Sequence, residues 1–157
     1  MGGTVNDDEA RLHKRTAVDL YNRVWELMEA EARTLDDDIE MVTAACASRY
    51  HWSIVGGPVQ VATGDWQIAR ALALLGDGSA AIRFARAALE RIRATDDAPD
   101  FMLASCYEGL ARAHAAAAGD SPERDRNIAL AREALDRIAE DDDRNEIARQ
   151  IDSVPTA

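Results

Sequence analysis

The sequence contains one pattern twice, as IRFARAALERI at Ile82–Ile92 and as IALAREALDRI at Ile128–Ile138. Both stretches read Ile, any residue, an apolar residue, Ala-Arg, any residue, Ala-Leu, an acid and Arg-Ile. Apolar residues recur in them every three or four positions, which is the period of an amphipathic α-helix. An alanine-rich stretch that ends in Gly-Asp precedes each copy, at Gly76-Asp77 and at Gly119-Asp120. The sequence therefore predicts two successive helical hairpins of similar construction.

Helix start and stop signals extend this prediction on both sides of the hairpins. Thr34 and Ser79 stand where N-terminal caps are expected, and Pro58 and Pro122 suit the first position of a helix. Gly-rich turns and Pro99 separate the apolar periodic segments from one another. We expect six or seven helices, at about 7–32, 36–54, 58–75, 80–92, 100–118, 122–139 and 142–154.

The composition supports an all-helical, single-domain fold. The chain has 157 residues, of which 47% are hydrophobic and 30% charged, a balance typical of globular proteins. Alanine is used heavily, aromatic residues make up 5%, and there are four prolines. Because alanine is the best helix former and lets helices pack closely, a fold built from helices is favoured over one built from strands.

The stretch ARALALLGDGSAAIRFARAALE, residues 69–90, resembles the core of a tetratricopeptide repeat (TPR). Ala69 takes the place of the small helix-packing residue, and Gly76-Asp77 takes the place of the turn. Residues 110–138 form a second, looser match, and the chain is also similar to short bacterial proteins of TPR-like type. The resemblance implies an all-α fold, a right-handed stack of antiparallel helical hairpins. The apolar signature of the second helix is matched at Ala81, Phe84 and Ala88.

In such a stack each hairpin buries its apolar face against its neighbours, and the end units act as caps. The last helix suits a cap, with Ile147 and Ile151 facing inward, and the first helix of each pair would line a concave side. We expect one domain over residues 1–157, with an irregular N-terminal helix pair at about 7–57, a first clear repeat at 58–95, a second repeat at 100–140 and a capping helix at 142–154.

The charge balance and the termini exclude several classes of protein. The net charge of −11 would repel phosphate groups, so we expect no nucleic-acid partner. No apolar run is long enough to span a membrane, so we expect no membrane partner. Residues 1–7 lack a basic segment followed by an apolar one, which predicts no signal peptide. We expect a cytoplasmic protein in which Cys46 and Cys106 are free, mostly buried thiols.

The alignment of the two repeats places Arg70 and Arg112 at equivalent positions, with Trp66 and Glu108 one helical turn before them. In peptide-binding TPR domains the corresponding position faces the groove. The resemblance therefore implies that Arg70 and Arg112 grip a carboxylate or phosphate, with Trp66 as an apolar floor. The alternative is that each arginine pairs with a nearby acid, for which Glu108 stands one turn from Arg112.

A second cluster, Arg49-Tyr50-His51-Trp52, is unusual in a chain with so few aromatic residues. One interpretation is that these four residues border a ligand pocket together with Trp66. The alternative is that Tyr50 and Trp52 seal the junction between the first two hairpins, while His51 bonds to a backbone carbonyl.

Metal and catalytic motifs find little support. The spacings of the candidate metal ligands suit no common site, and no serine stands in a G-x-S-x-G context. The runs Asp36–Asp38 and Asp141–Asp143 stand at predicted helix starts, where the helix dipole favours acids. We expect no cofactor and no metal. The candidate metal ligands are Cys46, His51, Cys106 and His114.

The leading hypothesis is a non-enzymatic TPR-like module with a protein or peptide partner, which grips an anionic group on its concave face. The alternative is a small-molecule-binding protein or enzyme, with a pocket near Arg49–Trp52 and Trp66. A third hypothesis is homo-oligomerisation through the alanine-rich helix face at Ala111–Ala118.

Overall fold

The structure is a computed structural model that describes residues 5–156. Residues 1–4, on which part of the signal-peptide expectation depends, lie outside the described residues. Within the described range the prediction of an all-α fold is confirmed, because the chain forms helices and no strand. These helices are α1 (Asp7–Glu29), α2 (Leu35–Val55), α3 (Pro58–Leu74), α4 (Gly78–Arg93), α5 (Asp100–Ala118), α6 (Pro122–Leu135) and α7 (Asp141–Asp152).

Side chains at the helix starts explain most of these boundaries. Thr34 caps α2 in a reciprocal capping box with Asp37, and Ser121 caps α6. The expectation that Ser79 caps α4 is wrong. The carboxylate of Asp77 instead accepts a hydrogen bond from the backbone N–H of Ala80 at 3.1 Å, so the helix begins earlier, at Gly78.

The end of α6 shows where the repeated pattern diverges. The whole of Ile82–Ile92 is helical, whereas the second copy stays helical only to Leu135. Beyond that point the backbone N–H of Arg137 donates to the carbonyl of Ala134, and that of Ile138 donates to the carbonyl of Leu135, both at 3.1 Å. These bonds span three residues and form a tight turn. This turn lets Ile138 enter the core while the chain reverses into α7.

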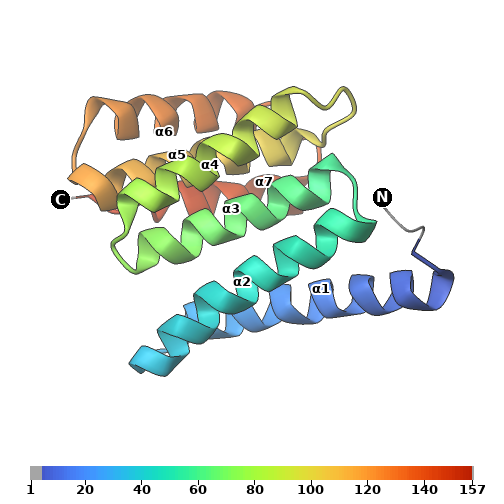
Figure 1. Cartoon of the computed structure of the whole chain (residues 1–157). Coiled ribbons are helices and arrows are strands. Elements are labelled where there is room, and N and C mark those ends of the chain that lie inside the picture. Colours follow the sequence, from blue (N-terminus) through green and yellow to red (C-terminus); the bar gives the residue numbers. More distant parts are fainter. Residues whose placement is uncertain (1–4, 157) are drawn as a thin grey trace.

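Consecutive helices pair and the pairs stack (Figure 1). The most extensive contacts lie within the pairs α1–α2, α3–α4 and α5–α6, and α2 and α4 link each pair to the next through α3 and α5. The first helices of the pairs are also neighbours, because α3 contacts both α1 and α5. Helix α7 packs against α5 and α6, with Ile147 and Ile151 buried as predicted. The handedness of the stack remains a prediction.

Alanines at equivalent positions let the helices approach closely. Ala85 and Ala88 of α4 match Ala131 and Ala134 of α6, and all four are buried in one core cluster. Such small side chains leave room for the larger apolar residues of the neighbouring helices. The repeated sequence therefore places buried alanines at the same positions of α4 and α6.

The alanine-rich face of α5 is largely used inside the chain. Ala111, Ala113 and Ala115 are buried. A Cβ added to Gly78 would clash with the backbone of Ala117, so the start of α4 packs directly on the end of α5. Homo-oligomerisation through this face remains a prediction, for which only Ala117 and Ala118 stay exposed.

The two thiols differ in their surroundings. Cys106 is buried as expected, but the prediction that Cys46 is mostly buried is wrong, because it is exposed. The buried residues of α2 are Met41, Ala44, Ala45 and Ser48, and Cys46 faces away from them. No helix in the described part of the chain is both long and apolar enough to cross a bilayer.

Candidate functional site

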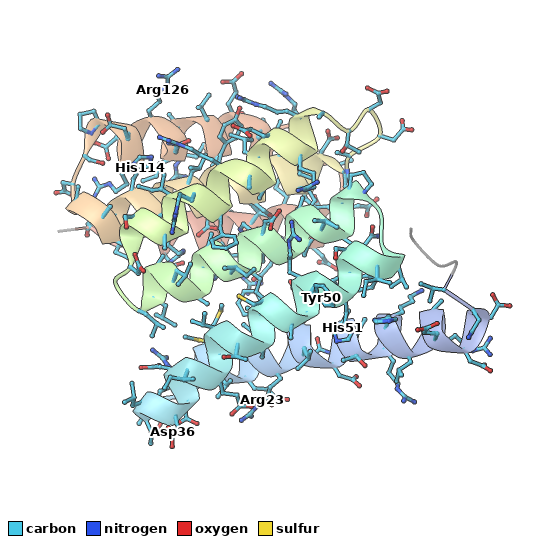
Figure 2. All side chains as sticks on the ribbon, in the orientation of Figure 1. Arg23, Asp36, Tyr50, His51, His114 and Arg126 are labelled. Atoms are coloured by element: carbon cyan, nitrogen blue, oxygen red, sulfur yellow. The ribbon has the colours of Figure 1, made fainter. Side chains whose placement is uncertain are left out.

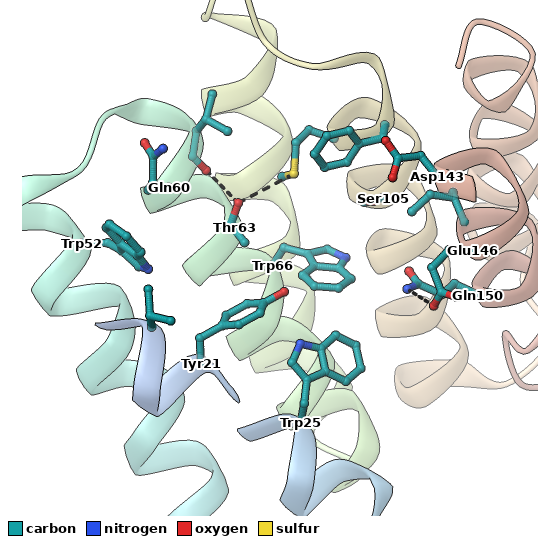
Figure 3. A pocket seen from close by; sticks show the side chains of 15 residues that line it. Tyr21, Trp25, Trp52, Gln60, Thr63, Trp66, Ser105, Asp143, Glu146 and Gln150 are labelled. Carbon is teal, nitrogen blue, oxygen red and sulfur yellow. Dashed lines mark hydrogen bonds between the residues drawn. The ribbon is translucent and has the colours of Figure 1, made fainter. Parts of the chain in front are cut away.

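A pocket of about 450 Å³ opens between α1, α3, α5 and α7 (Figure 3). Its lining contains all three tryptophans of the chain, one of its three tyrosines and one of its two phenylalanines. Aromatic residues make up only 5% of the chain, so most of its large rings are gathered around this one cavity. We call this cavity the aromatic pocket, and its rings are Tyr21, Trp25, Trp52, Trp66 and Phe101.

Helical spacing explains how each helix contributes one row of side chains. Helix α1 presents Val18, Tyr21 and Trp25, which lie three and four residues apart and so share one face. Helix α3 presents Val59, Thr63 and Trp66 in the same way, and Trp52 comes from the last turns of α2. The remaining lining residues are Gln60, Phe101, Met102, Ser105, Asp143, Glu146, Ile147 and Gln150.

The rings of Trp25 and Trp66 form the central contact of the pocket. Their centroids lie 5.9 Å apart, and the Tyr21 ring stands edge-on to Trp25 at 6.4 Å. Trp66 is buried against α5 at Gly109, where an added Cβ would lie only 2.8 Å from Cδ1 of Trp66. The position of this indole therefore depends on the absence of a side chain at Gly109.

The polar groups of the aromatic pocket are unevenly distributed. Asp143 and Glu146 of α7 bring two carboxylates to one side, with Trp52 on the other side (Figure 3). Nε2 of Gln150 donates to Glu146 at 3.0 Å. The described lining contains no Lys, Arg or His. The pocket is therefore mostly apolar, with negative charge along the α7 side.

Arg70 and Arg112 come together on one buried acid, Glu108, whose side chain is 0% exposed. Nη1 of Arg70 donates to its two carboxylate oxygens at 3.1 and 3.3 Å, and Nε of Arg112 donates to it at 2.7 Å. The Arg70 guanidinium also lies over the rings of Trp25 and Trp66, at 5.3 and 5.6 Å from their centroids. Burial lowers the pKa of Arg70, and Glu108 opposes that shift.

Arg112 has a further role at the end of α7. Its Nη2 donates to the backbone oxygen of Gln150 at 3.1 Å and to Oγ of Ser153 at 2.9 Å. Its Nη1 donates to the backbone oxygen of Ser153 at 3.3 Å. Arg112 thus satisfies carbonyl groups at the C-terminus of α7 and ties that helix to α5. An anion gripped by both arginines would have to compete with these bonds.

A second cavity, of about 580 Å³, adjoins the aromatic pocket. The two share Trp25, Glu146 and Gln150 in their linings. The second cavity is lined by Arg70 and Arg112, together with other charged residues from α1 and α7. Together the two cavities form one groove between α1 and α7, aromatic at one end and of mixed charge at the other.

Of the cluster Arg49–Trp52, only Trp52 lines the aromatic pocket. Nε of Arg49 donates to Oδ1 of the buried Asp65 at 2.8 Å, which joins α2 to α3. Tyr50 is 63% exposed, so it does not seal a junction between hairpins.

His51 lies beside α1, where it contacts another histidine (Figure 2). Nδ1 of His51 is 2.7 Å from Nδ1 of His13, instead of bonding to a backbone carbonyl. Burial and the neighbouring His13 lower the pKa of His51. This pair links α1 to α2 outside the aromatic pocket. Within residues 5–156, no group of three or more His, Cys, Asp or Glu residues is placed to hold a metal ion.

Sequence reasoning missed most of the pocket lining. It singled out Trp66 and Trp52, but not the contributions of Trp25, Tyr21 or Phe101. The available signal was the row Val18, Tyr21 and Trp25 along α1, an apolar stripe with large rings in a chain that has few. That stripe indicates a buried or ligand-facing side of the helix without saying what it faces.

No protein-family model, no curated protein and no solved structure matches the chain. The TPR resemblance therefore remains a prediction.

Proposed function

We propose that this chain is a non-enzymatic binding protein that takes a small organic ligand with an apolar body into the aromatic pocket. The observation that carries the proposal is the gathering of all three tryptophans around one open volume of about 450 Å³. Pockets for small molecules commonly span about 300 to 1,000 Å³, with mostly apolar and aromatic linings and a few polar groups. The aromatic pocket has this size and this character.

A purely structural role for these rings accounts less well for the open space. Protein interiors pack closely, and voids much larger than a water molecule are few. Tyr21, Trp25 and Trp52 line the pocket and are only partly buried. A ligand between them would remove further apolar surface from water, at about 25 cal/mol per Å².

A second candidate is an extended peptide that crosses both cavities, as the TPR resemblance suggests. Its support is the sharing of Trp25, Glu146 and Gln150 by the two cavities. An apolar side chain would fill the aromatic pocket, and an acidic group would meet Arg70 and Arg112 in the second cavity. Because Arg112 also holds the end of α7, Arg70 would be the main anion contact.

Intrinsic fluorescence tests the first proposal directly, because every tryptophan of the chain lines the pocket. We expect apolar members of a fragment library to shift or quench the emission, and calorimetry to give a single site. Trp52→Ala should weaken binding about tenfold, since a large ring of the site is removed. Tyr50→Ala is the matched control, since Tyr50 lies on the same helix outside the pocket, and its affinity should match that of the wild type.

Two results would count against the pocket as a small-molecule site. One is a library in which no fragment changes the emission. The other is equal affinity of the Trp52→Ala and Tyr50→Ala variants for every fragment that binds. Binding of acidic peptides that is lost in Arg70→Gln, without binding of fragments, would favour the second candidate.

A further inference from the structure

We propose that the aromatic pocket selects an organic cation, an alkylammonium or amidinium group carried on an apolar body. This inference rests on the proposed function, because it names the ligand class of the same pocket. Among the fifteen described lining residues, two are carboxylates and none is basic. The chain as a whole contains 18 Lys and Arg residues, so a lining without any of them is a distinctive feature.

The rings supply the first part of cation recognition. The face of an aromatic ring attracts a cation, and tryptophan does so most strongly. This chain already places one guanidinium, that of Arg70, over the rings of Trp25 and Trp66. Arg70 is not part of the aromatic pocket lining, so the surfaces of these indoles that face the pocket are left to a ligand.

The carboxylates of α7 supply the second part. Glu146 is engaged by Arg149 and by Gln150. Asp143 is exposed and makes no hydrogen bond or ion pair within the described part of the chain. Asp143 is therefore the carboxylate with its charge available to a ligand. Figure 3 shows it on the α7 side of the pocket, away from Trp52.

These positions predict how such a ligand lies. Its apolar body would contact Trp52 and Tyr21, and its cationic head would lie between the indoles of Trp25 and Trp66 and the carboxylate of Asp143. The net charge of −11 adds to this preference, because it raises the local concentration of cations and repels anions. An anionic group would be directed to the second cavity, where Arg70 and Arg112 lie.

Three compounds with one body and different heads test the proposal: 3-phenylpropylamine, 3-phenylpropanol and 3-phenylpropionate. Their phenyl ring and short chain are alike, so differences in affinity report the head group. We expect the amine to bind about tenfold more tightly than the alcohol, and the carboxylate to bind most weakly. Added salt should weaken binding of the amine and leave the alcohol unchanged. The readouts are tryptophan emission and calorimetry.

A matched pair of variants assigns the effect to one carboxylate. Asp143→Asn should reduce the affinity for the amine about threefold and leave that for the alcohol unchanged, as expected for one partly screened charge. Asp142→Asn is the control, because Asp142 stands in the same turn of α7, is exposed and does not line the pocket. Both positions are exposed, so both variants should fold like the wild type.

The possible failures separate this inference from the proposed function. If the alcohol and the amine bind equally, or if the carboxylate binds most tightly, the cation preference is wrong and the pocket still binds small molecules. If none of the three binds while other fragments do, the cation preference is again wrong. If no fragment of any charge binds, both proposals fail.

Discussion

Arg70 and Glu108 come from different hairpins and form an ion pair inside the protein, with Nη1 of Arg70 3.1 Å from Oε1 of Glu108. The Arg70 side chain is 15% exposed and the Glu108 side chain is 0% exposed. The same carboxylate accepts a bond from Arg112, whose other nitrogens hold the end of α7. One acid thus links α3, α5 and α7, three of the four helices that line both cavities. The stability of the groove should depend on it.

Glu108→Gln should destabilise the protein by about 3 to 5 kcal/mol, because two largely buried guanidiniums lose the charge that compensates them. Chemical denaturation followed by tryptophan emission measures this change. Glu133→Gln is the control, since its ion pair with Arg137 is largely exposed, and it should change stability by less than about 1 kcal/mol. Equal stability of the two variants would contradict a central role for Glu108.

Gly109→Ala should push Trp66 from its position and weaken ligand binding. The new Cβ would lie 2.8 Å from Cδ1 of Trp66. Overpacking destabilises a protein by about 1 to 3 kcal/mol. Alanine is up to about 1 kcal/mol more favourable than glycine inside a helix, so we expect a modest net loss of stability. Gly64→Ala is the control, because its Cβ would meet Arg49 instead. That variant should also lose stability, yet keep the affinity of the wild type, as measured by calorimetry.

The contact between His13 and His51 should make stability depend on pH. The pKa of His51 is lowered from 6.5 in the folded protein, so the folded state binds fewer protons than the unfolded state. The contribution of neutral His51 to the free energy of unfolding is therefore complete above about pH 6.5, and it is lost as the pH falls through the lower pKa of the folded state. The free energy of unfolding, measured between about pH 7 and pH 5, should fall more in the wild type than in His51→Gln.

The titration of His114 also contributes to the pH dependence of the free energy of unfolding. Its pKa is also lowered, by burial and by Arg86, so its titration destabilises the wild type and the His51→Gln variant alike. The difference between the two proteins therefore isolates the pair of His13 and His51. Parallel pH profiles would show that the pair contributes nothing.

The two cysteines should react at very different rates. Burial raises the pKa of Cys106 to about 12, and its side chain is inaccessible, so its thiolate is scarce in the native state. Cys46 is exposed on α2. A thiol reagent should modify one cysteine quickly in the native protein and both after unfolding. Cys46→Ser should abolish the fast phase, and a fast phase that survives this change would place Cys106 within reach of solvent.

Local features of the sequence were enough to predict the helices. Thr34, Pro58 and Pro122 mark helix starts, and the repeated Ala-Arg-x-Ala-Leu pattern predicts the buried alanine face of α4 and α6. Capping and periodicity act within a few residues, so they can be read along the chain. The same reading missed Asp77 as the cap of α4, since two candidate side chains stand close together there.

The contacts of the candidate site residues could be predicted only in part. Sequence reasoning found that Glu108 can pair with Arg112, because the two lie one turn apart on α5. It did not predict that Arg70, from another hairpin, shares that acid, nor that Arg112 also bonds to the end of α7.

The sequence by itself determined an all-helical chain with a duplicated hairpin, since both follow from local propensity and from the period of its apolar residues. Only the tertiary structure decided that Trp25 meets Trp66 at 5.9 Å and that Asp143 faces the same cavity. These contacts join α1, α3 and α7, which are far apart along the chain. They depend on the angles at which helices cross and on the packing of many side chains at once, and no short stretch of sequence encodes those quantities.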